Sequence, residues 1–392
     1  MKNISCIEVY YLMKTNRDKF TVCKNCVMDT SDSLLRFDEN GVCDYCQNYN
    51  INIKNRVENL SKSKSDLDQI VKKIKSKKND KYDCLIGISG GVDSCFLAHF
   101  VKIELNLNPL VVHVDTGWNS VESVNNIEKI IDGLDLDLET IVIPWNEMRD
   151  LQLSFFKAQH PNLDIPQDHA IFSSLYKYAI KNKISYILNG GNFSTECIRE
   201  PLEWAYHASD VRHIKDIHKK FGTTELKDFP LCDIFTYKIY FRYFKNLKVI
   251  QPLNYVKYNK KNAMELLKNL YGWMKYEHKH YESRFTKFYE GYWLLKKFGY
   301  DKRKAHFSSL ILTNQMKREE AMDKLDYYPI NDEEINNEFN FISQKLDISE
   351  NELKSIMHDR NKSYKDYKSS YFIIQFFVKL LRILKIESRL IR

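Results

Sequence analysis

The chain has 392 residues, 43% of them hydrophobic and 13% aromatic, and a formal net charge of +8. This composition fits a globular protein with one large or two medium domains and excludes a largely disordered chain. The charge is spread along a Lys-rich sequence, which indicates a well-solvated surface and leaves room for anionic ligands such as ATP, sugar nucleotides or tRNA.

Residues 1–19 lack the apolar segment of a secretory signal, and no run reaches the roughly 18 apolar residues of a membrane span. We therefore expect a cytoplasmic protein with an N-terminal extension. Nine cysteines, four of them in two Cys-x-x-Cys pairs, fit a reducing compartment and a metal site better than a disulfide framework.

Residues 20–50 are predicted to form a zinc-ribbon unit. Cys23 and Cys26 are separated from Cys43 and Cys46 by sixteen residues, a spacing typical of four-cysteine sites in which two tight turns surround one ion. The segment is too short and polar to fold on a core of its own, so the metal would supply most of its folding free energy. We interpret the site as structural Zn²⁺, with rubredoxin-like iron as the chemical alternative.

Residues 51–80 are predicted to be a linker helix. Its apolar residues recur at the i, i+3, i+4, i+7 spacing of one helix face. They are Leu67, Ile70, Val71 and Ile74.

From residue 81 to 200, strand and helix patterns alternate, which indicates an α/β fold with a parallel sheet and flanking helices. Strands are predicted at Tyr82–Ile88, Pro109–Val114, Thr140–Pro144 and Ser185–Leu188. Helices are predicted at Val92–Ile103, Ser120–Ile131, Trp145–Phe156 and Asp168–Lys181.

The run Ser89-Gly90-Gly91-Val92-Asp93-Ser94 lies directly between the first predicted strand and helix. Glycines allow close approach of the backbone, and unpaired N–H groups at a helix N-terminus favour an anion. Ser89 and Ser94 add hydroxyl donors, whereas Asp93 is suited to hold Mg²⁺ or to orient the loop. The run is not a Walker motif; it resembles the phosphate loop of the PP-loop ATP pyrophosphatases, which attack the α-phosphate of ATP.

Two further loops follow predicted strands and are expected to meet this phosphate loop at the carboxyl edge of the sheet. Asp115, after the second strand, is a candidate for ribose or metal. Gly190 and Asn192, after the fourth, are candidates to approach adenine or the phosphates. An ordinary turn is an equally good interpretation of each one alone.

Residues 201–392 are predicted to be a helical substrate or partner region. Its last segment, residues 371–392, has an apolar arc at helical spacing opposite a basic stripe of Lys379, Arg382, Lys385 and Arg389. We expect this helix to dock on the core or on a partner subunit. Peripheral contact with an anionic membrane is the alternative.

Several segments together resemble the N-acetyl sugar amidotransferases of the WbpG and pseudaminic-acid type, which belong to the PP-loop superfamily. The resemblance covers roughly residues 20 to 392. Its motifs are the two cysteine pairs, Asp164–Ala170, Asn189–Glu196, His280–Phe288 and Lys297–His306.

The resemblance implies an enzyme that adenylates the acetamido group of an N-acetyl sugar or nucleotide sugar and lets ammonia replace AMP. The product would be an acetamidino sugar for lipopolysaccharide or another surface glycan. Arg284 and Lys287, three residues apart on one helix face, are candidates for the phosphates. Candidates for sugar contacts or proton transfer are His169, Glu196, Arg199, Glu282 and His306.

The sequence offers no plausible glutaminase nucleophile, so ammonia would come from elsewhere. The resemblance implies a separate HisH-like glutaminase and a HisF-like subunit that delivers the ammonia. The main rival is a PP-loop enzyme of tRNA thiolation, for which Cys197 would be the reactive thiol. Amidotransfer, in contrast, requires no nucleic-acid partner.

Overall fold

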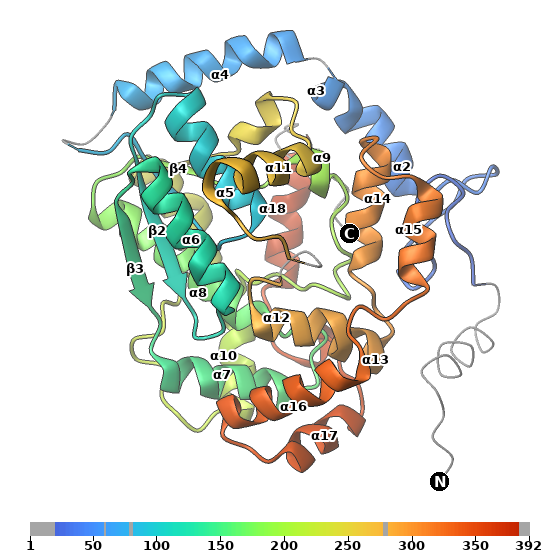
Figure 1. Ribbon diagram of the computed structural model, residues 1–392. Helices are drawn as coiled ribbons and strands as arrows, with labels where there is room; N and C mark the ends of the chain where they lie inside the picture. The colour runs from blue at the N-terminus through green and yellow to red at the C-terminus, as the bar shows by residue number, and fades with distance from the viewer. Residues whose placement is uncertain (1–19, 59, 78–80, 277–280, 384–392) are drawn as a thin grey trace.

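The computed structural model describes residues 20–58, 60–77, 81–276 and 281–383 (Figure 1). The predicted extension at residues 1–19 lies outside these ranges. Among the described residues, no helix is both long and apolar enough to cross a membrane.

A five-stranded parallel sheet forms the centre of the molecule, in the order β3-β2-β1-β4-β5. The strands are β1 (Cys84–Gly87), β2 (Pro109–Asp115), β3 (Leu138–Val142), β4 (Tyr186–Leu188) and β5 (Lys248–Ile250). The first four confirm the predicted strands within a few residues. The sequence did not predict β5, because only three residues are extended and they follow a stretch with helical character.

The sheet is buried on both faces, as parallel sheets are. Alternate residues of the strands enter two separate cores: Leu85 and Val112 face one, and Ile86 and Val111 face the other. The flanking helices are α5 (Val92–His99) with its π-helical continuation η2 (Phe100–Glu104), α6 (Val121–Leu134), α7 (Trp145–Lys157) and α8 (Ile165–Lys181). All four predicted helices are thus confirmed.

The N-terminal unit leads into the predicted linker helix. Its helices are α2 (Asp44–Asn48), η1 (Tyr49–Ile53), α3 (Lys54–Glu58) and α4 (Leu60–Lys75). Leu67 and Ile74 of α4 are buried in the same core as α5, which confirms the predicted apolar face.

In the described residues beyond Glu200, the regular elements are helices apart from β5, in agreement with the predicted helical character. The elements before α14 are α9 (Phe193–Glu196), α10 (Val211–Phe221), η3 (Thr236–Phe244), η4 (Pro252–Tyr255), α11 (Lys260–Tyr271), α12 (Arg284–Phe288), η5 (Tyr289–Trp293) and α13 (Leu294–Phe298). The remaining ones are α14 (Arg303–Leu312), α15 (Arg318–Leu325), α16 (Asp332–Leu346), α17 (Glu350–His358), η6 (Tyr364–Asp366) and α18 (Tyr371–Ile383). In Figure 1, α14 and α15 lie beside the N-terminal unit, while α16 lies next to α7 and α17 lies next to α16.

This C-terminal part shares a core with the sheet. Trp293 meets Phe156 of α7 edge to face, with 4.7 Å between ring centroids, and Phe285 contacts Trp118 at 5.0 Å. Aromatic pairs of this geometry add to the free energy gained by burial. The C-terminal helices are therefore held against the sheet by buried aromatic side chains.

Candidate nucleotide and acceptor site

The phosphate loop lies between β1, the central strand of the sheet, and α5. Gly91 is the N-cap of α5, and the Ser94 hydroxyl donates back to the Gly91 carbonyl at 3.0 Å. Gly90 has φ +81°, and a Cβ there would lie 2.5 Å from the Ser123 carbonyl oxygen. The loop thus needs glycine at this position for both its conformation and its packing.

Three groups from distant parts of the chain fix the loop. The Trp273 indole donates to the Gly90 carbonyl at 2.9 Å. The Tyr258 hydroxyl and the Asn192 amide donate to Asp93 Oδ1 at 2.6 and 3.3 Å. Burial, with the Asp93 carboxylate nearby, raises the pKa of Tyr258, so the hydroxyl keeps its proton and stays a donor.

The loop after β4 touches the phosphate loop, as expected from the sheet. A Cβ on Gly190 would lie 2.9 Å from the carbonyl of Asp93. A side chain at position 190 would not fit between the two loops. They can meet because residue 190 is a glycine.

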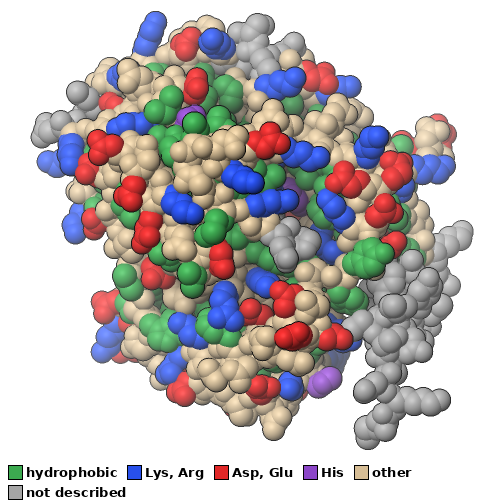
Figure 2. Space-filling model, viewed as in Figure 1, with side chains coloured by type: hydrophobic (Ala, Val, Ile, Leu, Met, Phe, Trp, Pro, Cys, Tyr) green, Lys and Arg blue, Asp and Glu red, His purple; other side chains and the backbone are tan. Residues whose placement is uncertain are grey.

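A cavity of about 550 Å³ opens at the phosphate loop. Its walls include Ser89, Gly91, Asp93 and Ser94 of the loop, and Lys260, Lys261 and Lys275 from the C-terminal part. Figure 2 shows Lys and Arg side chains gathered around the hollow at the centre of the visible face. Amides at a helix N-terminus facing lysines favour a polyphosphate.

Two more cavities adjoin this nucleotide cavity. One, of about 560 Å³, lies over the ends of β1, β2 and β4 and shares Ser89 and Glu282 with it. The other, of about 410 Å³, shares Glu196, Arg303 and His306 with it. We name these the strand-end cavity and the acceptor cavity.

Lys302 lies where the strand-end and acceptor cavities meet, and it lines both. Its ammonium group is 2.7 Å from Glu290 and 3.3 Å from Glu200. Burial opposes its charge, but the two carboxylates outweigh burial and raise the pKa of Lys302 well above its usual value. The boundary between the cavities is therefore a charged, partly buried triad.

Among the predicted catalytic residues, Asp93, Ser94 and Glu196 line the nucleotide cavity, as do Glu282 and His306, while Arg199 lines the acceptor cavity. His169 lies elsewhere. Its Nδ1 donates to the Ala208 carbonyl at 2.7 Å and its Nε2 accepts from the Cys232 amide at 3.0 Å. Burial lowers the pKa of His169 to about 4, so this histidine is a neutral, buried link between segments.

Arg284 and Lys287 share a face of α12 as predicted, but that face meets α16. Arg284 pairs with Glu338 at 3.1 Å, and Lys287 pairs with Glu334 at 3.1 Å. Neither is among the described residues that line the three cavities. The lysines of the nucleotide cavity occupy the place that we expected these two cations to take.

Asp115 holds its own turn. Its Oδ1 accepts from the Gly117 amide at 2.8 Å and from the Asn119 side chain at 3.0 Å. Asn119 in turn contacts His113 Nε2 at 2.9 Å, and His113 lines the strand-end cavity. Asp115 thus shapes this cavity through Asn119 and is not among its described lining residues.

Tyr258, Lys260, Lys261 and Trp273 were not predicted. The pair of lysines follows Asn259, which caps α11 by accepting from Asn262. A cap followed by lysines gives a signal for a helix start, but it does not indicate that this start faces the phosphate loop. That placement depends on how α11 packs against α5 and α6.

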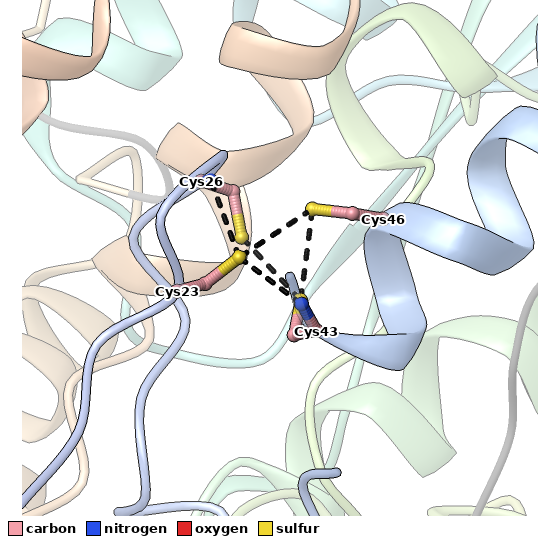
Figure 3. A group of neighbouring side chains, drawn as sticks. All are labelled: Cys23, Cys26, Cys43 and Cys46. Carbon is pink, nitrogen blue, oxygen red and sulfur yellow. Dashed lines mark hydrogen bonds between the residues drawn. The ribbon is translucent and has the colours of Figure 1, made fainter. Parts of the chain in front are cut away.

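The four predicted metal ligands lie together, fully buried, as drawn in Figure 3. Their sulfurs are 3.6 Å apart for Cys26–Cys43 and Cys43–Cys46, and 3.9 Å apart for Cys23–Cys46. Four sulfurs at about 2.3 Å from one tetrahedral ion would be about 3.8 Å from each other. A four-iron cluster needs wider separations, because its iron atoms lie between the thiolates. The site therefore fits one metal ion.

The cysteine unit is fixed to the helices that border the nucleotide cavity. Arg318 of α15 donates to the carbonyls of Cys23 and Cys26 at 2.9 and 3.0 Å. The Ser308 hydroxyl of α14 accepts from the Val27 amide at 3.1 Å. Since α14 also carries His306, the metal unit supports one wall of the site.

The central phosphate loop and its parallel sheet define the class: an α/β fold of the PP-loop type. Residues 282–381 match the family described as "LPS biosynthesis protein WbpG-like, C-terminal domain". The C-terminal part of the chain is thus similar to a WbpG-like domain, which confirms the resemblance seen in the sequence over these residues.

Among curated proteins, the chain is similar to an uncharacterized protein of Methanocaldococcus jannaschii, MJ1599, with 26% identity over 117 residues. The match covers 30% of this chain and 40% of that relative's length.

Two solved structures are similar at low identity. The U34-tRNA thiolase NcsA from Methanococcus maripaludis, with its [4Fe-4S] cluster, is 13% identical with a TM-score of 0.32, over 88% of this chain and 91% of that one. The NH3-dependent NAD synthetase from Campylobacter jejuni is 16% identical with a TM-score of 0.28, over 54% and 84%.

Proposed function

We propose that this protein is an ATP-dependent amidotransferase that converts the acetamido group of an N-acetyl sugar or nucleotide sugar into an acetamidino group. The observation that carries the proposal is the arrangement of the cavities. The phosphate loop lines a nucleotide cavity faced by lysines, and this cavity is continuous with the strand-end cavity at Ser89 and Glu282 and with the acceptor cavity at Glu196 and His306. This arrangement would hold a nucleotide at the loop and a second substrate in an adjoining cavity.

In the proposed reaction the amide oxygen attacks the α-phosphorus of ATP and pyrophosphate leaves. Ammonia then adds to the activated carbon, and AMP leaves with the oxygen. The amides at the start of α5 and the three cavity lysines would hold the pyrophosphate charge. Mg²⁺ bound with ATP would offset further phosphate charge, and Asp93 and Glu282 are the residues that would hold it.

The addition of ammonia releases a proton, which needs an acceptor. His306 Nδ1 lies 3.2 Å from the Thr195 carbonyl and therefore carries its hydrogen, which makes Nε2 the acceptor nitrogen. Nε2 lies 3.3 Å from the Lys260 ammonium group. We assign proton transfer to His306 and to Glu196, because both line the nucleotide and acceptor cavities.

The source of ammonia belongs to the same proposal. Among the described residues, no cysteine lines the three cavities, so no glutaminase nucleophile is at hand there. A HisH-like glutaminase with a HisF-like subunit is the proposed supplier. Zn²⁺ is the proposed ion of the cysteine unit, in a structural role, because all four sulfurs are buried and the ligand set is complete.

The absence of cysteine from the described lining of the three cavities also weighs against tRNA thiolation. Cys197 is buried, its sulfur lies 3.9 Å from the Ser309 carbonyl, and it packs beside the cysteine unit. Cys95 is fully buried within α5, and burial raises its thiol pKa. Neither thiol is placed for sulfur transfer.

The test is to incubate the protein with ATP, ammonium and a panel of acetamido sugars and nucleotide sugars. AMP and pyrophosphate should form in equal amounts with the right sugar, and mass spectrometry should find oxygen replaced by NH. Glu196→Gln should lower amidine formation at least tenfold, whereas Glu203→Gln, on the same segment but outside the three cavities, should not. AMP release that depends on tRNA and not on a sugar would contradict the proposal.

A further inference from the structure

The last described helix, α18, presents an apolar arc to solvent. Phe372, Phe376 and Ile383 are 84%, 65% and 77% exposed, and Ile373 and Leu380 continue the arc. Ile374 is buried. The exposed apolar residues recur at the spacing of one helix face. That face is therefore directed to solvent and does not pack on the chain's own core. Large apolar arcs of this kind mark a surface that binds something.

The start of α18 is bound to α10. The Ser370 amide donates to Asp210 at 2.6 Å, and the Lys368 amide donates to Asp216 at 3.0 Å. Asp210 also caps α10 by accepting from the His213 amide. These hydrogen bonds place the start of α18, and with it the beginning of the exposed arc, next to α10.

The exposed side of α10 is basic. Arg212, Lys215 and Lys219 are exposed and lie three and four residues apart, so they follow one side of the helix. The carboxylates of the same helix turns do not cancel this charge fully, because Asp210 and Asp216 are buried and bind backbone amides. Lys379 adds an exposed cation on α18. The other predicted members of the basic stripe of α18 lie outside the described side chains.

A third segment joins this surface. Asp233 and Ile234, just before η3, line one depression together with Arg212, Lys215, Lys368 and Ser370. Within residues 235–245, Phe235, Tyr243 and Phe244 are exposed, the last by 74%. Arg242 and Lys245 alternate with them, each over a tyrosine ring, at 5.7 and 5.5 Å from the ring centroid.

We propose that α18, the basic side of α10 and residues 235–245 form a docking surface for an anionic lipid membrane. Bulky apolar side chains that project beside exposed Lys and Arg are what an interfacial site requires: the apolar groups enter the acyl boundary and the cations meet acidic headgroups. Three of the five exposed apolar side chains of α18, Ile373, Leu380 and Ile383, have no ring on which a base could stack, which favours acyl chains over a nucleic acid. The protein would then carry out its chemistry at a membrane surface without spanning it.

The test uses the full chain and sedimentation with vesicles of phosphatidylcholine, with or without phosphatidylserine. The wild type should bind only vesicles that contain phosphatidylserine, and added salt should weaken binding. Replacing Arg212, Lys215 and Lys219 together by Gln should lower the partition coefficient by on the order of a hundredfold. Phe376→Ser should lower it about tenfold.

Two matched controls separate the surface from general effects. The triple replacement of Lys72, Lys73 and Lys75 by Gln removes the same charge from exposed positions of α4, and it should leave most of the binding. Leu270→Ser changes a side chain that is 60% exposed on α11, and it should have no effect. Thermal unfolding of each variant checks that the fold is kept.

Four results would overturn the proposal. The wild type fails to bind phosphatidylserine vesicles, or the α4 control loses as much binding as the α10 triple. Alternatively, sedimentation velocity without lipid finds a dimer that Phe376→Ser dissociates, which would make a second copy of the chain the occupant. Salt-sensitive binding of tRNA that the α10 triple abolishes, without vesicle binding, would identify a nucleic acid instead.

Discussion

Gly190→Ala should disable the nucleotide site through a single methyl group. The added Cβ would lie 2.9 Å from both the carbonyl carbon and oxygen of Asp93, and 3.2 Å from the Ser94 nitrogen. Ordinary van der Waals contact begins at 3.4 Å, so the two loops must separate by about 0.5 Å. Both neighbours are backbone atoms of the phosphate loop, and neither can rotate away as a flexible side chain would.

This separation has two measurable consequences. Overpacking between two fixed backbones costs about 1–3 kcal/mol of stability. Displacing the amides that hold the phosphates should lower ATP-dependent pyrophosphate release by on the order of a hundredfold, because misplacement of positioning groups by an ångström or less is felt at the reacting atoms.

Gly191→Ala is the matched control. Its Cβ would lie 2.6 Å from the end of the Gln251 side chain, which can move aside at little cost. The assay compares pyrophosphate release, ATP affinity by calorimetry and thermal unfolding for the two variants. If Gly190→Ala retains the ATP affinity of Gly191→Ala, then the contact between these loops does not determine the nucleotide site, and the reasoning fails.

Three other predictions follow from buried groups. Tyr258→Phe removes the 2.6 Å hydrogen bond to Asp93 and should cost about 1–2 kcal/mol of unfolding free energy in a denaturant titration; an unchanged midpoint would contradict the role given to Tyr258. Cys43→Ser should abolish stoichiometric zinc in metal analysis. It should also lower the melting temperature, because the bound ion, and not a hydrophobic core, stabilises this unit. Full metal content in the variant would exclude the four-thiolate site. His169 has a pKa of about 4 in the folded protein against an ordinary value of 6.5, so it contributes stability above pH 6.5 that is lost as the pH falls toward 4. The amount is about 3 kcal/mol, and His169→Gln should flatten the pH dependence of unfolding over that range; an unchanged pH dependence in the variant would contradict this role of His169.

The sequence by itself determined the elements whose signals are local. Alternation of strands and helices predicted β1 to β4 and α5 to α8, because buried parallel strands are short apolar runs between amphipathic helices. The cysteine pairs predicted the tetrahedral cluster, since ligand spacing fixes two tight turns. The run from Ser89 to Ser94 predicted the phosphate loop. Glycine allows the positive φ and the close backbone approach that such a loop requires, and the amide groups at a helix start favour an anion.

Only the tertiary structure decided which side chains meet across the chain. Arg284 and Lys287 have the spacing of phosphate ligands, but ion pairs with α16 hold them, whereas Lys260 and Lys275 reach the nucleotide cavity. His169 lies in one of the segments that resemble the amidotransferases. Burial and two hydrogen bonds with backbone groups nevertheless make it a neutral link between segments of the chain. Contacts of this kind join residues separated by tens to hundreds of positions, and no periodicity in the sequence encodes them. Local patterns therefore define the loop that holds a phosphate, and packing of distant helices selects the cations and acids that surround it.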